Sequence, residues 1–595
     1  MSKHSRSGSL ETNGKRRDQS FVQGTVILTG SLLLVKLMGI LFRVFVTGMI
    51  GPTGATYFTV AYEIYNPLFA LATAGLPIAI SRMVSENVAN GRYRDVKKIK
   101  KICTPIFLLT GTMGLLLMTI GAFVVPNLPF VHVPGAFYSV LALAPTMFFA
   151  CLMSIYRGYY QGLKNMTPTA TSEVIEACCK FFIGYVTSYS IIHFGMSEYA
   201  ARGTFLGRAY ATRELAEAAI MPLASAGAIL GISLGAAAGF LYLVLRDKLR
   251  GDGITKEEIS ASPQARGGML IAKTLIKSAL PIGLGAIIMN LAGLIDTTLI
   301  LHRIQCIMLT SPGELLAQYG DKIGETVIKG KDGVHGFLMG CYSFTLPLMM
   351  LVPAITQAFG IVALPSVTRA WTLRDGKKLK KGMETVIRMT MMVTIPAGIG
   401  LAVIGPELLS VIYASRPNAV SIAAGIIPVL GVAMIFTAAS TPICSMLQAI
   451  GRVDLPVKII SAGLGIKIIV NYALVGIPKI NIQGAGIGTL VGYAFILVAA
   501  MVELFKNTRI IPDFIGTIAK PLAASLICGL AAKVAILLLK GRVPLIVAIV
   551  LSIIFAAVVY AFSLITLGGV TRDDIKLLPK GEKFIKILEK LKFIS

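Results

Sequence analysis

The chain has 595 residues, of which 55% are hydrophobic and only 14% carry a charged side chain. A soluble protein of this length would carry roughly 25% charged residues, so the composition excludes a soluble enzyme and indicates a chain surrounded mostly by lipid. The 56 Lys and Arg against 29 Asp and Glu give a net charge of +27, but no soluble basic domain is present to bind nucleic acid. A multi-pass membrane protein has the same excess, because its cytoplasmic loops collect Lys and Arg.

Motifs for metals, disulfides and nucleotides are missing from the sequence. The eight cysteines include no CxxC pair, and the five histidines show no ligand spacing. We therefore expect no disulfide framework, no metal and no cofactor. A GxxxxGK[ST] loop is also absent, which argues against coupling to ATP.

The polar and basic residues 1–21 begin the chain, and no A-x-A cleavage site follows the first apolar run. We interpret them as a retained cytoplasmic tail. Behind it, runs of about 20 apolar residues, each long enough to cross a bilayer core, predict about fourteen transmembrane helices. The expected spans are 22–47, 56–82, 102–126, 136–160, 168–193, 222–245, 274–301, 336–362, 384–405, 422–446, 455–475, 484–503, 514–540 and 543–567. With this count most Lys and Arg fall in cytoplasmic loops and tails, so both termini are expected in the cytoplasm of a protein of the cell membrane.

Two cations lie inside the first span. Lys36 and Arg43 are seven residues apart with Gly39 between them, so they share one helix face about 10 Å apart along the axis. A charge at mid-bilayer costs ~2.5–3.5 kcal/mol on insertion scales, which makes it a functional hypothesis by default. This face could hold a diphosphate group. The alternative is that Arg43 extends to the outer headgroups.

Carboxylates in later spans are candidates for ion coupling. Glu63 in the second span and Asp296 in the seventh lie toward the outer side, and Glu63 could pair with Arg43. In the fifth span Glu173, Glu176 and Lys180 share one face. One interpretation is that these residues form an internal ion pair that holds the first half of the chain together. The other is that they form a cavity wall, in which Lys180 binds substrate and the carboxylates couple transport to a cation.

The eleventh span carries Lys467 and Asn471 four residues apart, on what we expect to be the corresponding wall of the second half of the chain. Both are candidate substrate-binding residues. Their span belongs to a weak internal repeat. Gln161 is followed after 19 residues by Lys180, and Gln448 after 19 residues by Lys467.

The order of these echoes predicts two lobes of six helices in the same orientation, a parallel repeat about an axis along the membrane normal. The expected parts are an N-lobe at 22–245, a cytoplasmic linker at 246–269, a C-lobe at 270–503 and two further spans within 514–567. Residues 571–595 alternate apolar and lysine positions, which predicts a basic amphipathic helix on the anionic lipids of the inner leaflet.

Four stretches carry a family resemblance. They are GLPIAISRMVSENVANGRY (75–93), RGYYQGLKNMTPTA (157–170), ALPIGLGAIIMNLAGLIDTTL (279–299) and LQAIGRVDLPVKII…NYALVGIPKINIQGAGIGT (447–489). Together they resemble the polysaccharide-transport and stage V sporulation protein B branch of the multidrug/oligosaccharidyl-lipid/polysaccharide exporter superfamily.

This resemblance implies two six-helix lobes around a central cavity that opens alternately to each side. It also implies flipping of a lipid-linked glycan precursor for cell-wall or spore-cortex peptidoglycan, with cell-wall synthesis proteins as candidate partners. Lipid II flippases of the superfamily carry extra cations in the second and eighth helices. Here Leu68-Phe69 and Thr345-Leu346 stand near those places.

Three functions compete at this point. A flippase for an undecaprenyl-diphosphate-linked glycan suits the cationic first span, whereas a cation-coupled multidrug exporter of the same fold would favour acidic cavity walls. A membrane glycosyltransferase would need an acidic catalytic loop, and the outer loops hold no DxD-like pair. We therefore expect a transporter and not an enzyme.

Overall fold

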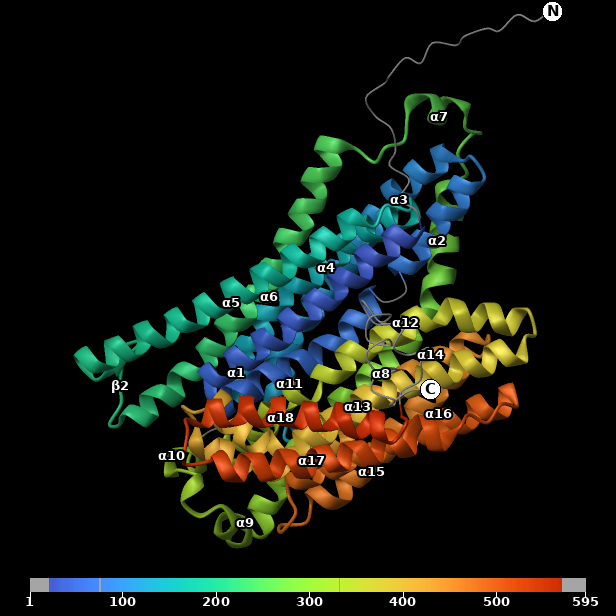
Figure 1. Cartoon of the computed structure of the whole chain (residues 1–595). Helices are drawn as coiled ribbons and strands as arrows, with labels where there is room; N and C mark the ends of the chain where they lie inside the picture. The colour runs from blue at the N-terminus through green and yellow to red at the C-terminus, as the bar shows by residue number, and fades with distance from the viewer. Residues whose placement is uncertain (1–20, 74–75, 331, 570–595) are drawn as a thin grey trace, which may run out of the picture.

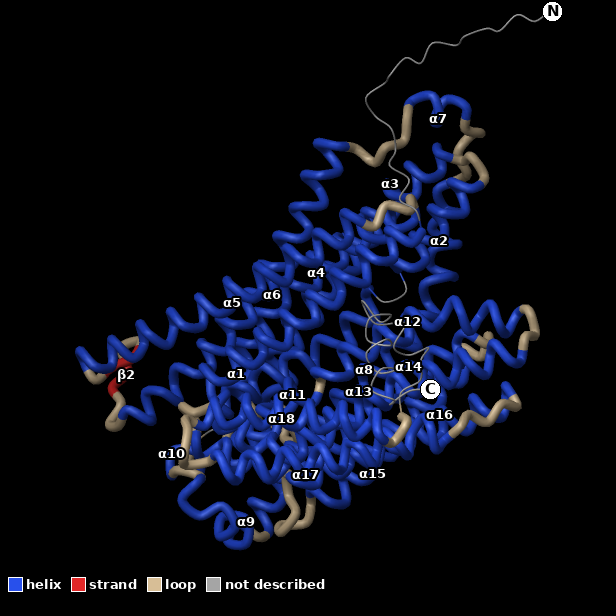
Figure 2. Tube along the Cα trace, viewed as in Figure 1, coloured by secondary structure: helices blue, strands red, loops and turns tan. Residues whose placement is uncertain are grey.

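The computed structural model describes residues 21–73, 76–330 and 332–569. Nearly all of these residues are helical (Figures 1 and 2), so the expected all-helical membrane fold is confirmed. The predicted basic tail, apart from Phe21, and the predicted amphipathic helix at 571–595 lie outside the described residues.

The first six helices pack on one another and form what we call the N-lobe. They are α1 (Phe21–Thr73), α2 (Leu76–Ala89), α3 (Tyr93–Val124), α4 (Phe137–Gly162), α5 (Thr167–Arg202) and α6 (Arg213–Arg250). Helix α6 lies against α5 and α4, and α4 lies against α2 and α3. Short 3-10 turns at Val125–Asn127 and Pro134–Ala136 join α3 to α4. A small antiparallel hairpin, β1 (Thr204–Phe205) and β2 (Arg208–Ala209), joins α5 to α6.

The linker between the lobes contains one short helix, α7 (Lys256–Ala261), which begins at a capping box formed by Thr255 and Glu258. It leads to α8 (Gly268–Thr310), which contacts α1, α2 and α3 of the N-lobe as well as α11 and α15 of the second half of the chain. Helix α8 therefore belongs to both sides of the molecule.

The remaining helices of the repeat form what we call the C-lobe. They are α9 (Pro312–Tyr319), α10 (Glu325–Ile328), α11 (Gly333–Met349), α12 (Leu351–Thr372), α13 (Gly376–Ile412), α14 (Pro417–Ala449), α15 (Asp454–Val475) and α16 (Gln483–Thr508), with a 3-10 turn at Gly320–Lys322. Helix α14 is central here and contacts α11, α12, α13 and α16. A π-turn at Ile515–Ala519 leads to α17 (Lys520–Leu539) and α18 (Leu545–Thr566), which pack on each other and on α13 (Figure 1).

Thirteen helical segments of the described residues are long and apolar enough to cross a membrane. One of them, Gly30–Ala70, is two helices joined at Gly51, whose positive φ of 68° breaks the helix just before Pro52. The predicted second span, 56–82, is accordingly divided between the second helix of α1 and α2. The chain is a multi-pass membrane protein, and the count of fourteen stays a prediction.

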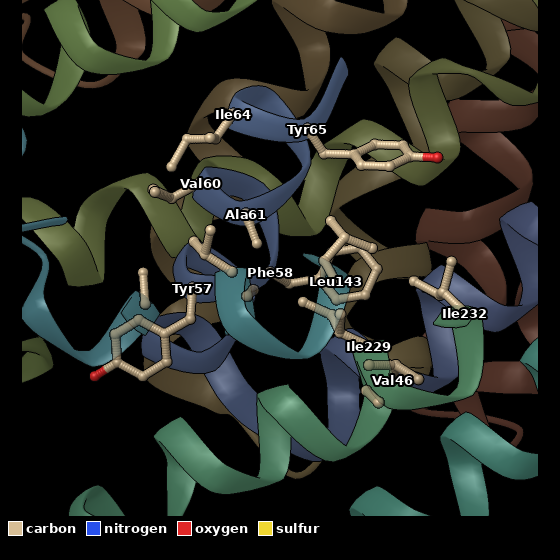
Figure 3. Close-up of a cluster of buried hydrophobic side chains, with 14 of the residues drawn as sticks. Val46, Tyr57, Phe58, Val60, Ala61, Ile64, Tyr65, Leu143, Ile229 and Ile232 are labelled. Atoms are coloured by element: carbon tan, nitrogen blue, oxygen red, sulfur yellow. The ribbon is translucent and has the colours of Figure 1, made fainter. Parts of the chain in front are cut away.

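The N-lobe core forms where the two helices of α1 meet α4 and α6. Figure 3 shows Tyr57, Phe58 and Ala61 of α1 together with Leu143 of α4 and Ile229 and Ile232 of α6, all of them buried. Because large side chains fill the space between these helices, the first helix of α1 is held at a fixed position beside α5.

The two lobes are closed against each other at the end of the molecule that carries Gly51, which we call the Gly51 end. Gly340 of α11 lies so close to α1 that a Cβ atom there would be 1.9 Å from the carbonyl oxygen of Pro52. Thr56 donates a hydrogen bond to the carbonyl of Gly336 at 2.6 Å. Such close approach of helices through small residues is typical of packing in membranes.

Hydrogen bonds to a carboxylate and an ion pair add to the closure of the Gly51 end. Asp332, which precedes α11, accepts hydrogen bonds from the Tyr57 hydroxyl at 2.5 Å and the Gly135 amide at 3.0 Å. Arg416 of the C-lobe forms an ion pair with Glu217 of α6 at 2.5 Å. These contacts join the lobes from three N-lobe elements.

Candidate functional site

A cavity of about 830 Å³ lies between the two lobes. Helices α1 and α5 line it from the N-lobe, and α11, α12, α14, α15 and α16 line it from the C-lobe. Its residues on α1 run from Lys36 to Tyr62, and its residues on α14 run from Thr437 to Gln448, so it occupies the part of the molecule away from the Gly51 end. A volume of this order is typical of sites for small molecules or headgroups.

Three cations line the N-lobe wall of the cavity. Lys36 and Arg43 come from α1, as the sequence predicted, and Lys180 comes from α5. The guanidinium of Arg43 donates a hydrogen bond to Thr59 at 3.3 Å and lies 5.8 Å from the ring centroid of Phe58. The contact with Thr59 fixes one edge of the guanidinium and leaves other N–H groups for a ligand.

Aromatic rings hold the side chain of Lys180. Its ammonium donates a hydrogen bond to the Tyr62 hydroxyl at 3.1 Å and lies 5.2 Å from the ring centroid of Phe42. These cation–π and hydroxyl contacts keep the charge in place without neutralising it. Among the described residues, no ion pair is recorded for Lys180 or for Lys36.

Lys467 and Asn471 do not line this cavity. They instead bind Asp296 of α8, Lys467 through an ion pair of 2.8 Å and Asn471 through a hydrogen bond from its side-chain amide. Asp296 and Asn471 are buried, and the Asn471 side-chain oxygen has no hydrogen-bond partner among the residues that the structure describes. The structure therefore brings together a predicted coupling residue and two predicted binding residues as one buried cluster.

Glu63 lies between that cluster and the cavity. Its carboxylate interacts electrostatically with Arg43, Lys467 and Asp296. An ion pair of Glu63 with Arg43 is not recorded among the described residues, so the expected pair is an interaction at longer range. Two carboxylates and two cations thus balance one another across α1, α8 and α15.

The ion pair expected within α5, between Lys180 and a carboxylate of the same face, does not form. Glu176 pairs with Arg157 of α4 at 2.8 Å and not with Lys180. Arg157 also donates to Ser172 at 3.0 Å. Glu173 accepts a hydrogen bond of 3.5 Å from Ser31 of α1. Glu176 therefore stabilises the contact between α4 and α5, while Lys180 one turn further faces the cavity.

The resulting charge balance of the site is positive. Arg43 and Lys467 have Glu63 and Asp296 nearby, whereas Lys36 and Lys180 have no such counter-ion within the part of the chain that the structure describes, and the described lining of the cavity includes no Asp or Glu. Groups of three or more His, Cys, Asp or Glu that could hold a metal ion are absent from the described part of the chain. The cationic lining of the cavity can bind a polyanionic group.

Several residues of the site were not predicted from the sequence. Arg157 was missed because it lies at the end of a span, where a cation usually reaches the interface. Asp332 and Arg416 were missed because a loop residue shows no periodicity. The polar residues of α14 that line the cavity do recur with helical spacing, which would have identified them.

Two family models match the sequence. Residues 21–222 match the family described as polysaccharide biosynthesis protein, and residues 341–556 match the family described as lipid II flippase MurJ. Stage V sporulation protein B of Bacillus subtilis (strain 168) is 23% identical over 94% of this chain and 98% of its own length. Lipid II flippase MurJ of the same organism is 20% identical over 82% of both chains.

Solved structures share the fold. Lipid II flippase MurJ in an inward closed conformation superposes with a TM-score of 0.59 at 13% identity, over 90% of this chain and 98% of that one. An inward-facing multidrug resistance MATE family transporter of the MOP superfamily gives a TM-score of 0.57 at 15% identity, over 82% of this chain and 97% of that one. At these identities the structures support the fold alone.

Proposed function

We propose that this chain, whose resemblance to the multidrug/oligosaccharidyl-lipid/polysaccharide exporter superfamily is now confirmed, flips a lipid-linked glycan precursor across the cytoplasmic membrane. The substrate is a glycan on an undecaprenyl-diphosphate carrier, of the kind that supplies peptidoglycan or another wall polysaccharide. The relatives named for sporulation and for lipid II support this class of substrate.

The observation that carries the proposal is the charge of the cavity. Lys36, Arg43 and Lys180 converge on it from α1 and α5, and its described lining has no carboxylate. A diphosphate is the part of such a substrate that is most costly to desolvate, and charge-assisted hydrogen bonds offset that cost. Arg43 can engage two oxygens at once, because its guanidinium is a planar fork of donors.

The multidrug exporter remains the alternative, since a transporter of that type shares the fold. A site for cationic drugs would need acidic walls, and this cavity has cationic ones. The charge therefore favours the flippase.

We assign the present conformation to the inward-facing half of an alternating-access cycle. The Gly51 end, which loop charges predict to be outside, is closed by α1 against α11. Opening that end must break these contacts, while the cavity closes at the other end.

We further propose that Asp296 and Glu63 couple transport to an ion or proton gradient. They interact with Lys467 and with the cavity residue Arg43, so a change of their charge would be felt at the substrate site. Glu173 accepts a hydrogen bond from Ser31 of α1, and Glu176 is paired with Arg157. Both are therefore weaker candidates for coupling. Flipping that proceeds equally fast and to the same extent without any gradient would rule this coupling out.

The test of the proposed function is transport by the purified chain in liposomes. A fluorescent polyprenyl-diphosphate-linked sugar should cross the liposome bilayer. Each of the variants Lys36→Ala, Arg43→Ala and Lys180→Ala should bind this lipid roughly ten- to a hundredfold more weakly, since each removes a charged hydrogen-bond partner. Arg43→Lys should be intermediate, because it keeps the charge and loses the fork.

Lys533→Ala is the matched control. It removes a lysine from α17, outside the cavity, and should leave binding unchanged. Full binding by all three cavity variants would refute the diphosphate site. If Arg43→Ala lowers only protein abundance and Glu63→Ala restores it, then Arg43 is part of the scaffold.

A further inference from the structure

The C-lobe wall of the cavity differs from the N-lobe wall in its chemistry. On α14 the cavity is lined by polar side chains at Thr437, Ser440, Thr441, Ser445 and Gln448, with Cys444 between them. Their spacing of three and four residues places them on one helix face. Gln357 of α12 lines the same side. We call these residues the α14 polar face.

The α14 polar face is neutral and presents mainly acceptors. The hydroxyls of Thr437, Ser440 and Ser445 donate back to carbonyls of their own helix, at 2.9, 2.9 and 3.0 Å. These residues line the cavity, and each hydroxyl oxygen still has two lone pairs that can accept a hydrogen bond. A ligand that offers O–H or N–H donors can therefore bind to these three hydroxyls, whereas a phosphate, which only accepts, gains little from them.

Two amides add donors as well as acceptors. Gln357 and Gln448 are exposed to the cavity, and no hydrogen bond is recorded for either side chain among the described residues. A primary amide offers two donors and one acceptor oxygen, which matches an acetamido group or paired sugar hydroxyls. Water can satisfy these amides until a ligand replaces it.

From this division of the cavity we infer that the α14 polar face is a subsite for the neutral sugar of the substrate, which orients it with its diphosphate on α1 and α5. The inference rests on the proposed function and deepens it. The substrate class is an uncharged sugar rich in hydroxyl or acetamido groups, directly linked to a prenyl diphosphate. An acidic sugar would be held less well, because the α14 polar face has no cation to balance it.

The test compares two ligands on the purified full-length chain in lipid nanodiscs. One is a prenyl diphosphate without sugar, and the other is the same lipid carrying one N-acetylhexosamine. The unmodified chain should bind the sugar-bearing lipid more tightly. In the double variant Gln357→Leu with Gln448→Leu, which keeps side-chain size and removes both amides, the affinity for the sugar-bearing lipid should fall about tenfold, while that for the bare lipid should change less than about twofold.

Two controls separate this inference from the function on which it rests. Ser421→Ala alters a polar residue of α14 outside this cavity and should leave both affinities unchanged. Lys36→Ala should weaken both ligands alike. Equal affinity of the unmodified chain for both lipids, or an equal loss for both in the double variant, would overturn the sugar subsite and leave the flippase proposal standing. Failure of the unmodified chain to bind either lipid would overturn both.

Discussion

At the scale of single residues, the buried ion pair between Asp296 and Lys467 joins a residue expected to couple transport to an ion with a residue expected to bind substrate. Both side chains are largely buried, and the Asn471 side-chain amide donates a second contact to the same carboxylate. Taking two charges out of water is costly, so a pair of this kind is weak evidence for stability. A role in function explains better why it lies beside the charged cavity.

We predict that Lys467→Met will lower stability by roughly 3–5 kcal/mol, because it leaves the Asp296 carboxylate buried without its cation. Adding Asp296→Asn removes that charge and should restore most of the unfolding temperature in detergent, with Lys467→Met alone as the reference. Transport should stay lost in the double variant if the pair couples transport to a gradient. Transport that returns together with stability would show that the pair is only a scaffold.

At the scale of elements, the contact of α1 with α11 is the closure of the Gly51 end. We predict that Gly340→Ala weakens this closure, because its Cβ would collide with the carbonyl of Pro52, and overpacking of this kind costs about 1–3 kcal/mol. A cysteine at Thr53 should then react faster with a soluble thiol reagent, and transport should slow. Gly336→Ala on the same helix is the control, since its Cβ would meet Asp332 at an ordinary 3.5 Å. Equal effects of the two substitutions would contradict this role of Gly340.

The linker that contains α7 is fastened to the N-lobe by Asp252. Lys97 pairs with it at 2.6 Å, and the Tyr159 hydroxyl donates to it at 2.6 Å. Burial alone would raise the pKa of Asp252, but these hydrogen bonds and the charge of Lys97 outweigh it and hold the pKa below its usual value. The stabilisation is therefore complete above the unfolded pKa of about 3.9 and is lost as the pH falls through the lower folded pKa.

This sign predicts that the linker stays fastened from pH 5 upward, and that Asp252→Asn loosens it at every such pH. Trypsin should then cut at Lys256 faster in the variant than in the unmodified chain, at pH 6 as well as at pH 8. A strong pH dependence of cleavage in the unmodified chain over that interval, after correction for trypsin itself, would contradict a depressed pKa.

At the scale of the whole molecule, the sequence was sufficient for the helices and the cationic face of α1, because apolar runs and intramembrane charges are local signals. It was not sufficient for pairings between distant helices. Lys467 shares a helix face with Asn471, as predicted. The partner of that face is set by the packing of α15 against α8, which places Asp296 beside Lys467. The closure of the Gly51 end could not be predicted for the same reason, since the partners of Asp332 and Arg416 come from the other lobe.

The orientation of the molecule rests on the same local signals and can be tested at the two ends of α6. Leu206 in the hairpin before α6 and Leu249 at its far end are 69% and 81% exposed, so a cysteine at either position will react if the reagent reaches it. The basic linker follows Leu249, and Lys- and Arg-rich loops stay in the cytoplasm. We therefore predict that an impermeant maleimide labels Leu206→Cys in intact cells and labels Leu249→Cys only after the membrane is permeabilised. The unmodified chain, with its eight cysteines, gives the background labelling.

The reverse labelling pattern would place the Gly51 end inside the cell. The closed state would then face outward, with its cavity open to the exterior.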